Sequence, residues 1–121
     1  MSYRLELEML GLPKLPNELR WKHWAIVRTH DGEWHWAVYD AVARDRKPVA
    51  PLKRAELTLV RHSARQPDPD ALAQSFKPCI DGLVKIGVLE DDSAEHVTLD
   101  CRWEKAAPRR GYITVIVEEK T

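Results

Sequence analysis

Apolar and polar residues alternate in four segments of the chain, and each of these segments predicts a β-strand. In residues 2–9, SYRLELEM, Arg4, Glu6 and Glu8 face one side, and the opposite side carries Tyr3, Leu5, Leu7 and Met9. This period of two is typical of a half-buried strand. Residues 55–61, 97–103 and 112–118 predict three more strands. A basic loop with Pro108 and Gly111 joins the last two, so we expect them to form an antiparallel hairpin.

The first helical region spans residues 18–43 between the first two strands. Prolines and a glycine precede it, and Asn17 is placed to cap the helix that follows. Residues 29–32, THDG, interrupt the pattern, and Gly32 costs about 1 kcal/mol relative to alanine inside a helix. The region is therefore either one long helix or two helices joined at a turn.

The second helical region precedes the third strand. Pro78 suits the first turn of a helix, Gly87 suits its end, and apolar residues recur from Ile80 to Ile86. Leu72 and Phe76 are four residues apart, so an earlier helical segment kinked at Pro78 fits equally well.

These elements predict the fold class. The order is β-α-β-α-β-β, which indicates an α+β protein with a small mixed or antiparallel sheet and helices on one face. The length of 121 residues and an apolar share of 44% suit a single domain over residues 1–121.

Charge is balanced overall but uneven along the chain. Lysine and arginine total 19, as do aspartate and glutamate. Residues 1–65 carry 12 basic and 8 acidic residues, and the remainder carries 7 basic and 11 acidic, so the two parts have net charges of +4 and −4. Cys79 and Cys101 have no metal-ligand spacing, and we see neither a signal peptide nor an apolar run that could span a membrane. We therefore expect a reduced, cytoplasmic setting.

Acidic residues frame the second helical region. Asp68 and Asp70 follow a strand, and side chains two apart in an extended segment point the same way, so the two carboxylates can converge on one divalent cation. The alternative is a solvated, proline-rich turn. Glu90, Asp91 and Asp92 form the other dense acidic cluster, and Lys77 lies between the two groups.

The stretch DPDALAQSFKPCIDGLVKIGVLEDDS resembles the signature region of the RusA-type crossover junction endodeoxyribonucleases, a family of Holliday junction resolvases. The family pattern has DxDN, a lysine that starts a helix, a D-[AG]-L step and a G-x-L-x-DD turn. The early strand, the loop LPKLPN and the later helix and strands follow the family only in order. Two differences stand out: Ala71 replaces the usual asparagine, and the step from Asp70 to Lys77 is longer.

The resemblance implies a magnesium-dependent endonuclease that acts as a homodimer on branched DNA, with Mn²⁺ as an alternative ion. It assigns Asp68, Asp70 and Asp92 as metal ligands, with Asp91 able to exchange roles with Asp92, and Lys77 as a catalytic residue. Lys77 has a structural alternative, an i, i+4 ion pair with Asp81. Such a site would hydrolyse a phosphodiester bond through metal-activated water.

DNA would need cations outside the acidic site. We single out Arg65, Arg109 and Arg110, although each also fits a solvated surface. The full set of candidate cations is Arg20, Lys22, Arg28, Lys53, Arg54, Arg61, Arg65, Arg109 and Arg110. Several tryptophans of the first helical region could stack on bases or supply a core or dimer contact; these are Trp21, Trp24, Trp34 and Trp36. Two further hypotheses are a junction-binding protein without cleavage and a protein-interaction domain that uses the tryptophan-rich helix.

Overall fold

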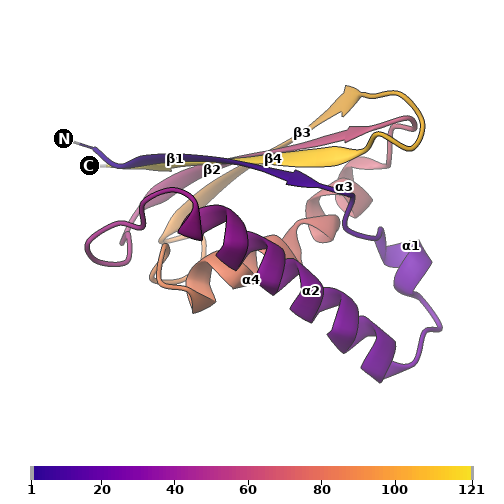
Figure 1. The fold of residues 1–121 in the computed structure, drawn as a ribbon, viewed down its shortest axis with the longest axis horizontal. Coiled ribbons are helices and arrows are strands. Elements are labelled where there is room, and N and C mark those ends of the chain that lie inside the picture. The colour runs from indigo at the N-terminus through magenta and orange to yellow at the C-terminus, as the bar shows by residue number, and fades with distance from the viewer. Residues whose placement is uncertain (1, 121) are drawn as a thin grey trace.

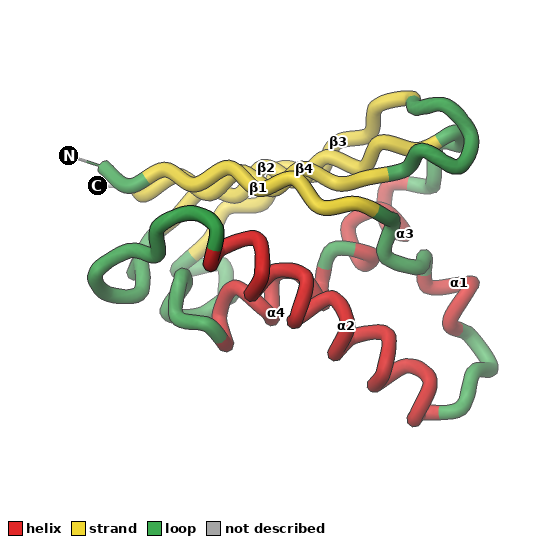
Figure 2. Tube along the Cα trace, viewed as in Figure 1, coloured by secondary structure: helices red, strands yellow, loops and turns green. Residues whose placement is uncertain are grey.

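A four-stranded sheet and a layer of helices on one of its faces make up the fold (Figures 1 and 2). This computed structural model describes residues 2–120. The elements are β1 (Arg4–Leu10), α1 (Pro16–Leu19), α2 (Trp24–Ala43), β2 (Ala55–Ser63), α3 (Pro69–Ser75), α4 (Lys77–Lys85), β3 (Val97–Lys105) and β4 (Tyr112–Glu119). The predicted α+β class, with a mixed sheet covered on one face, is confirmed.

The sheet has the strand order β1-β4-β2-β3. β4 pairs antiparallel with both β1 and β2, whereas β2 and β3 are parallel. The predicted hairpin between the last two strands is therefore wrong. Helices α3 and α4 return the chain to the start of β2, where Ala55 pairs with Val97, so β3 forms an edge. β4 takes a central position because three of its side chains are fully buried: Ile113, Val115 and Val117.

One apolar core fills the space between the sheet and the helices. α2 contributes Trp34, Val38 and Val42, and α4 packs closely beside it, with Gly82 facing the backbone of α2. Every second residue of β1 enters the same core, as the sequence predicted. The largest fully buried side chains include Phe76, Leu5, Leu57, Leu59, Leu83 and Ile113.

α2 is one continuous helix that runs through residues 29–32. Its N-cap is His23, whose Nδ1 accepts a hydrogen bond from the Ala25 N–H at 3.1 Å. Asn17 instead lies inside the short helix α1, so its predicted capping role is wrong. The helix continues past Gly32 because the residues that follow are held in the core, and their burial outweighs the glycine's helix penalty of about 1 kcal/mol.

The second helical region is two helices rather than one. α3 ends before the fully buried Phe76, and α4 begins at Lys77 with Pro78 in its first turn. Gly87 has a φ of +86°, a conformation that glycine adopts without strain, and it ends α4 as predicted. Cys79 is buried in α4, and burial raises the pKa of its thiol to about 12.

The opposite face of the sheet carries no helix within residues 2–120 (Figure 2). Alternation along the strands puts eight charged side chains on this outer sheet face, six acidic and two basic: Glu6, Glu8, Glu56, Asp100, Glu104, Glu118, Arg4 and Arg102. Its net charge is −4. Because the chain has a formal charge of zero, the remaining residues together carry +4.

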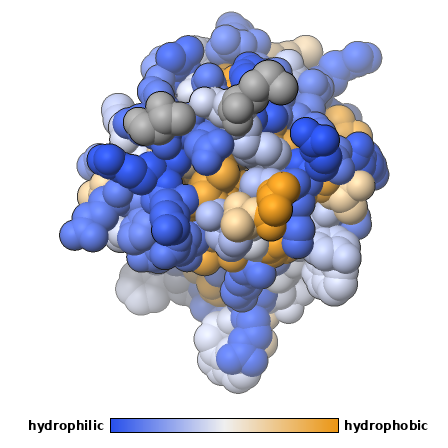
Figure 3. All heavy atoms as spheres, turned by 90° about the vertical axis from the view of Figure 1, so that its left-hand side faces the viewer, coloured by the Kyte–Doolittle hydropathy of each residue, from blue (hydrophilic) through white to orange (hydrophobic). Residues whose placement is uncertain are grey.

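The two ends of the described chain lie side by side at one end of the sheet (Figure 1). The Glu119 N–H donates to the Tyr3 carbonyl at 2.9 Å, and the Tyr3 N–H donates to Oε1 of Glu119 at 3.0 Å. Hydrophilic residues cover most of this end, around a small apolar patch (Figure 3). Within residues 2–120, none of the helices has the length and apolar character needed to cross a membrane.

Candidate metal and DNA site

The carboxyl ends of β1, β2 and β3 meet at one edge of the sheet, because these strands run in the same direction. Three connecting segments begin there: residues 11–15, 64–68 and 106–111. The sequence-predicted residues Asp68 and Asp70 and the basic loop around Arg109 therefore start from the same edge. Ligand sites commonly form where connecting loops converge on a rigid sheet.

Asp68 and Asp70 lie at the start of α3. Asp68 is the N-cap residue with extended backbone, and its carbonyl accepts the Leu72 N–H at 2.8 Å; Asp70 lies in the first turn. Both side chains are exposed and line a hollow of about 550 Å³ that also includes Asn17 and Arg20 from the α1 region. The hollow thus combines two carboxylates, one cation and three side-chain amides, those of Asn17, Gln66 and Gln74.

Lys77 lies at the start of α4 between two carboxylates. Its Nζ is 3.5 Å from Oδ2 of Asp92 and 3.6 Å from Oδ1 of Asp81. The Coulomb attraction of Asp81, followed by that of Asp92, raises the pKa of Lys77. The i, i+4 ion pair of Lys77 with Asp81 is therefore present. Lys77 also contacts Asp92, which is 15 residues away in the sequence. The Lys77 side chain is 69% exposed and can reach a ligand.

Asp91 belongs to a neighbouring turn rather than to the Lys77 cluster. A hydrogen bond from the Asp92 backbone N–H lowers the pKa of Asp91, and Ser93 and His96 add to this effect. Its Oδ2 lies 3.9 Å from Nδ1 of His96, which also contacts the Ser93 hydroxyl at 2.8 Å. Asp92 therefore contacts Lys77, and Asp91 does not, which favours Asp92 as the functional acid of the pair.

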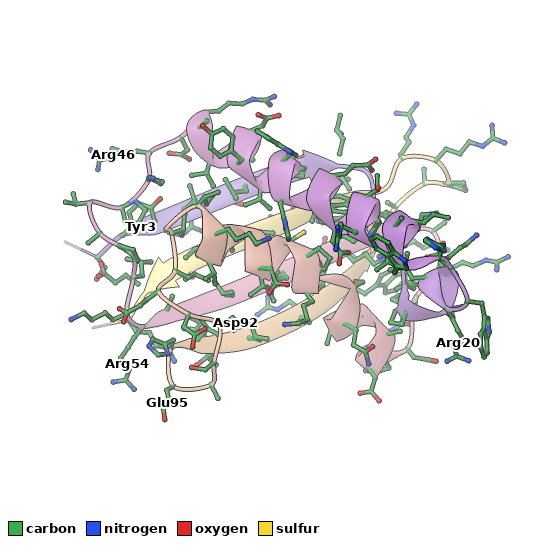
Figure 4. The ribbon with its side chains drawn as sticks, turned by 90° about the horizontal axis from the view of Figure 1, so that it is seen from below. Tyr3, Arg20, Arg46, Arg54, Asp92 and Glu95 are labelled. Carbon is green, nitrogen blue, oxygen red and sulfur yellow. The ribbon has the colours of Figure 1, made fainter. Side chains whose placement is uncertain are left out.

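The structure does not bring all three predicted metal ligands together. Arg20 lines the hollow of Asp68 and Asp70 and lies at the α1 end of the molecule. In the view of Figure 4, Asp92 lies on the other side of the picture, well separated from Arg20. Among residues 2–120, no group of three or more histidine, cysteine, aspartate or glutamate side chains is close enough to hold one metal ion. Asp68 and Asp70 alone still fit a hydrated magnesium ion, which commonly takes one or two carboxylates and fills its other positions with water and phosphate.

The predicted DNA-binding arginines lie at the same edge of the sheet. Arg109 and Arg110 are exposed and line a second hollow, of about 720 Å³, together with Gly111. A Cβ at Gly111 would lie 2.5 Å from Cδ1 of Leu12, so a larger residue there would require the Leu12 side chain to move. Arg65 is exposed just beyond β2, and its carbonyl accepts the Ser63 hydroxyl at 2.8 Å.

Arg61, one of the candidate DNA-binding cations, is instead buried, so that expectation is wrong for this residue. It is only 5% exposed, and its Nη1 donates to the Pro13 carbonyl at 2.6 Å. Burial lowers the pKa of Arg61, while the charge of Glu18 opposes that shift. The side chain therefore fixes the loop that leads to Asn17 instead of meeting DNA. The sequence indicated this burial, because Arg61 follows Leu57 and Leu59 at alternate positions on the buried face of the strand.

The tryptophans of the first helical region divide into two groups. Trp34 is in the core at 8% exposed, which confirms the core interpretation for that residue. Trp21, Trp24 and Trp36 are exposed, at 94%, 62% and 67%. The Arg28 guanidinium lies 4.7 Å from the Trp24 ring centroid. These three rings are thus available to a partner or a ligand.

Comparison of the chain with models of protein families and with curated proteins found no match.

Proposed function

We propose that this protein is a metal-dependent, structure-selective DNA endonuclease that resolves four-way junctions by phosphodiester hydrolysis. The observation that carries the proposal is the contact between Lys77 and Asp92, 15 residues apart in the sequence. The resemblance to the RusA-type enzymes assigns these two residues to one site. The exposed carboxylates of Asp68 and Asp70, at the start of the neighbouring helix α3, supply the rest of the predicted constellation.

Asp68 and Asp70 would hold Mg²⁺ or Mn²⁺ at the hollow beside Asn17. A bound divalent ion there supplies Lewis-acid activation of water and of the scissile phosphate. Asp92 is paired with Lys77 and lies apart from the other two acids, so it would have to exchange that partner and move toward them to join the site. A phosphate of the DNA could replace Asp92 as the anionic partner of Lys77, so the lysine would keep a neighbouring negative charge.

Lys77 would stabilise the negative charge that develops on the phosphate or the leaving oxygen. Two features of the structure support this role: the ammonium is exposed, and its carboxylate neighbours raise its pKa and so keep it protonated at neutral pH. Asp81 orients the side chain from one turn further along α4. The arginine loop at residues 109–110 and Arg65 would bind flanking phosphates at the same edge of the sheet. A homodimer would present two such edges to one junction.

Cleavage of a labelled four-way junction with Mg²⁺ or Mn²⁺ tests the proposal. We expect Asp70→Asn and Lys77→Met each to reduce the nicking rate roughly 100-fold or more, the typical effect of removing a group that stabilises the transition state. Asp100→Asn is the matched control, because Asp100 is an aspartate on the outer sheet face. Absence of nicking at every metal concentration, or full activity of Asp70→Asn, would contradict the proposal.

Metal binding has a readout of its own. Titration of the protein with Mn²⁺, followed by calorimetry without DNA, should show weaker binding in Asp68→Asn and Asp70→Asn and unchanged binding in Asp100→Asn. The variant Asp92→Asn tests whether the third acid joins the site. Mn²⁺ binding weakened as much as in Asp70→Asn would indicate that Asp92 is a ligand, and unchanged Mn²⁺ binding would indicate that Asp92 acts only as the ion-pair partner of Lys77.

A second candidate is junction binding without cleavage. It is favoured by the absence, within residues 2–120, of three acids close enough for one ion, and by Ala71 in the place of the family's asparagine. Junction binding in EDTA, combined with no nicking under any metal, would select this alternative.

A further inference from the structure

A hollow of about 720 Å³ lies along the first half of α2, apart from the acidic site. It is lined by residues spaced three or four apart on that helix, namely Trp24, Arg28, Asp31 and His35, with Lys22 and Lys85 at its sides. This stripe differs from the buried stripe of the same helix, which carries His30, Trp34, Val38 and Val42. None of the residues that line the hollow is needed for the core.

The charge of the hollow favours an anion. Lys22, Arg28 and Lys85 contribute three positive charges against the single carboxylate of Asp31. Burial, and then the nearby Lys85, lower the pKa of His35, so this ring stays neutral and its Nδ1 faces the Lys85 ammonium at 3.4 Å. The hollow therefore has a net charge of +2, whereas the outer sheet face has −4.

The hollow also offers a planar aromatic surface. The Trp24 ring is 62% exposed, with the Arg28 guanidinium against it at 4.7 Å and the His23 ring tilted beside it at 5.3 Å. Tryptophan and arginine are the residues on which unpaired bases stack, and this stacking tolerates any base because each has a π face. Cations spaced around an exposed indole fit a ligand that alternates phosphates with planar rings.

We propose that this α2 hollow binds an unpaired DNA strand, with a base stacked at Trp24 and its flanking phosphates held by Lys22, Arg28 and Lys85. The choice of DNA rests on the proposed function. All bases of a four-way junction are paired, but the pairs beside the branch point lose stacking neighbours when the arms open, so these pairs are the ones whose opening would supply an unpaired strand. The strand approaches from the helical side, since the acidic outer sheet face repels phosphate.

Fluorescence anisotropy of a labelled oligothymidylate of about ten nucleotides, measured in EDTA, tests the hollow without any cleavage. We expect Trp24→Ala to weaken binding roughly 10-fold or more and Trp24→Phe to recover part of the loss, because phenylalanine still stacks. Lys22→Gln and Arg28→Gln should each make the plot of log affinity against log salt shallower by about 0.7. Trp36→Ala and Arg102→Gln are the controls, an exposed tryptophan of α2 outside the hollow and an exposed arginine of the outer sheet face.

Wild-type affinity in Trp24→Ala, or an equal loss in Trp36→Ala, would overturn the proposal. Competition by thymidine monophosphate or by intact duplex as effective as that by the oligonucleotide would also overturn it, because an unpaired strand would then not be the preferred ligand. Failure of the nuclease proposal is separately visible: loss of strand binding in Trp24→Ala, with no nicking by the wild type under any metal, would leave the hollow assigned and remove only the cleavage. If nicking depends on Asp70 but strand binding does not depend on Trp24, the nuclease proposal stands and the assignment of the hollow is overturned.

Discussion

The two halves of α2 use similar residues for different purposes. Trp34, in the second half, is 8% exposed and packs in the core, while Trp24, in the first turn, is 62% exposed and lies against Arg28. The second half also buries Val38 and Val42, whereas the first half buries only His30. The difference comes from the position of each half: the second half of α2 runs close to the sheet, and the first half leads away from it (Figure 1). A helix can thus combine a structural half with a half that is free for recognition.

Trp34→Ala should have the largest effect on stability. Removal of a core tryptophan leaves a cavity and typically costs about 3–5 kcal/mol, so we expect a large drop in the denaturant midpoint. Trp36→Ala, two residues along the same helix but exposed, should stay within about 0.5 kcal/mol of the wild type. Equal losses in the two variants, measured by urea unfolding, would show that the two sides of the helix do not differ as described.

His30→Ala, at the buried residue of the first half, should have the next largest effect. The Nε2 of His30 accepts the Lys14 N–H at 3.0 Å, and Nδ1 lies 2.9 Å from Asp31. Loss of the acceptor leaves a partly buried N–H without its partner, at a cost of about 1–3 kcal/mol. Amide hydrogen exchange at Lys14 should accelerate in this variant, and unchanged exchange would contradict this role.

Gly32→Ala should stabilise the protein by a smaller amount. A Cβ at this position would meet nothing within 4 Å, and Gly32 lies within a continuous helix. Alanine should therefore raise the free energy of unfolding by about 0.5–1 kcal/mol. Gly82→Ala is the contrasting variant, because its Cβ would lie 3.3 Å from Val38. A destabilised Gly32→Ala would indicate that the first half of α2 is not regularly helical.

His35 should give the smallest effect, visible as pH dependence. Its pKa is lowered in the folded state by burial and then by Lys85, so below about pH 6.5 the unfolded chain binds more protons at this residue. The contribution of His35 to stability is thus present above that pH and is lost as the pH falls. The difference in stability between wild type and His35→Gln should shrink as the pH falls through this range. A constant difference from pH 8 to pH 5, measured by thermal unfolding, would contradict the shift.

Local pattern predicted the elements, but not their arrangement. Alternation placed β1 within a residue or two of each end, because its apolar side chains enter the core. The hairpin between β3 and β4 was mispredicted because strand order depends on which strand fills the buried central position of the sheet. β4 buries three side chains completely and takes that position, whereas β3 buries only Val97 and lies at the edge. The closeness of two strands in the sequence does not show which of them takes the central position.

The candidate site shows the same limit. The Lys77–Asp81 contact follows from helical spacing and was predicted as an alternative. The contact with Asp92 depends on how the loop after α4 folds back, which spacing alone does not determine. Burial of Arg61 could have been predicted, because it continues the apolar face of β2. The charge separation between the outer sheet face and the helical side required the sheet register, since it combines residues from four separate strands.

The adjacent ends of the chain have a practical consequence. Because residues 3 and 119 are hydrogen-bonded neighbours, a short linker could join residues 2 and 120, and new ends could be opened in the exposed connection after α2, at residues 45–50. The permuted chain would keep every strand pairing of the sheet. Such a circularly permuted protein offers a route to attach probes far from Trp24 and from the acidic hollow.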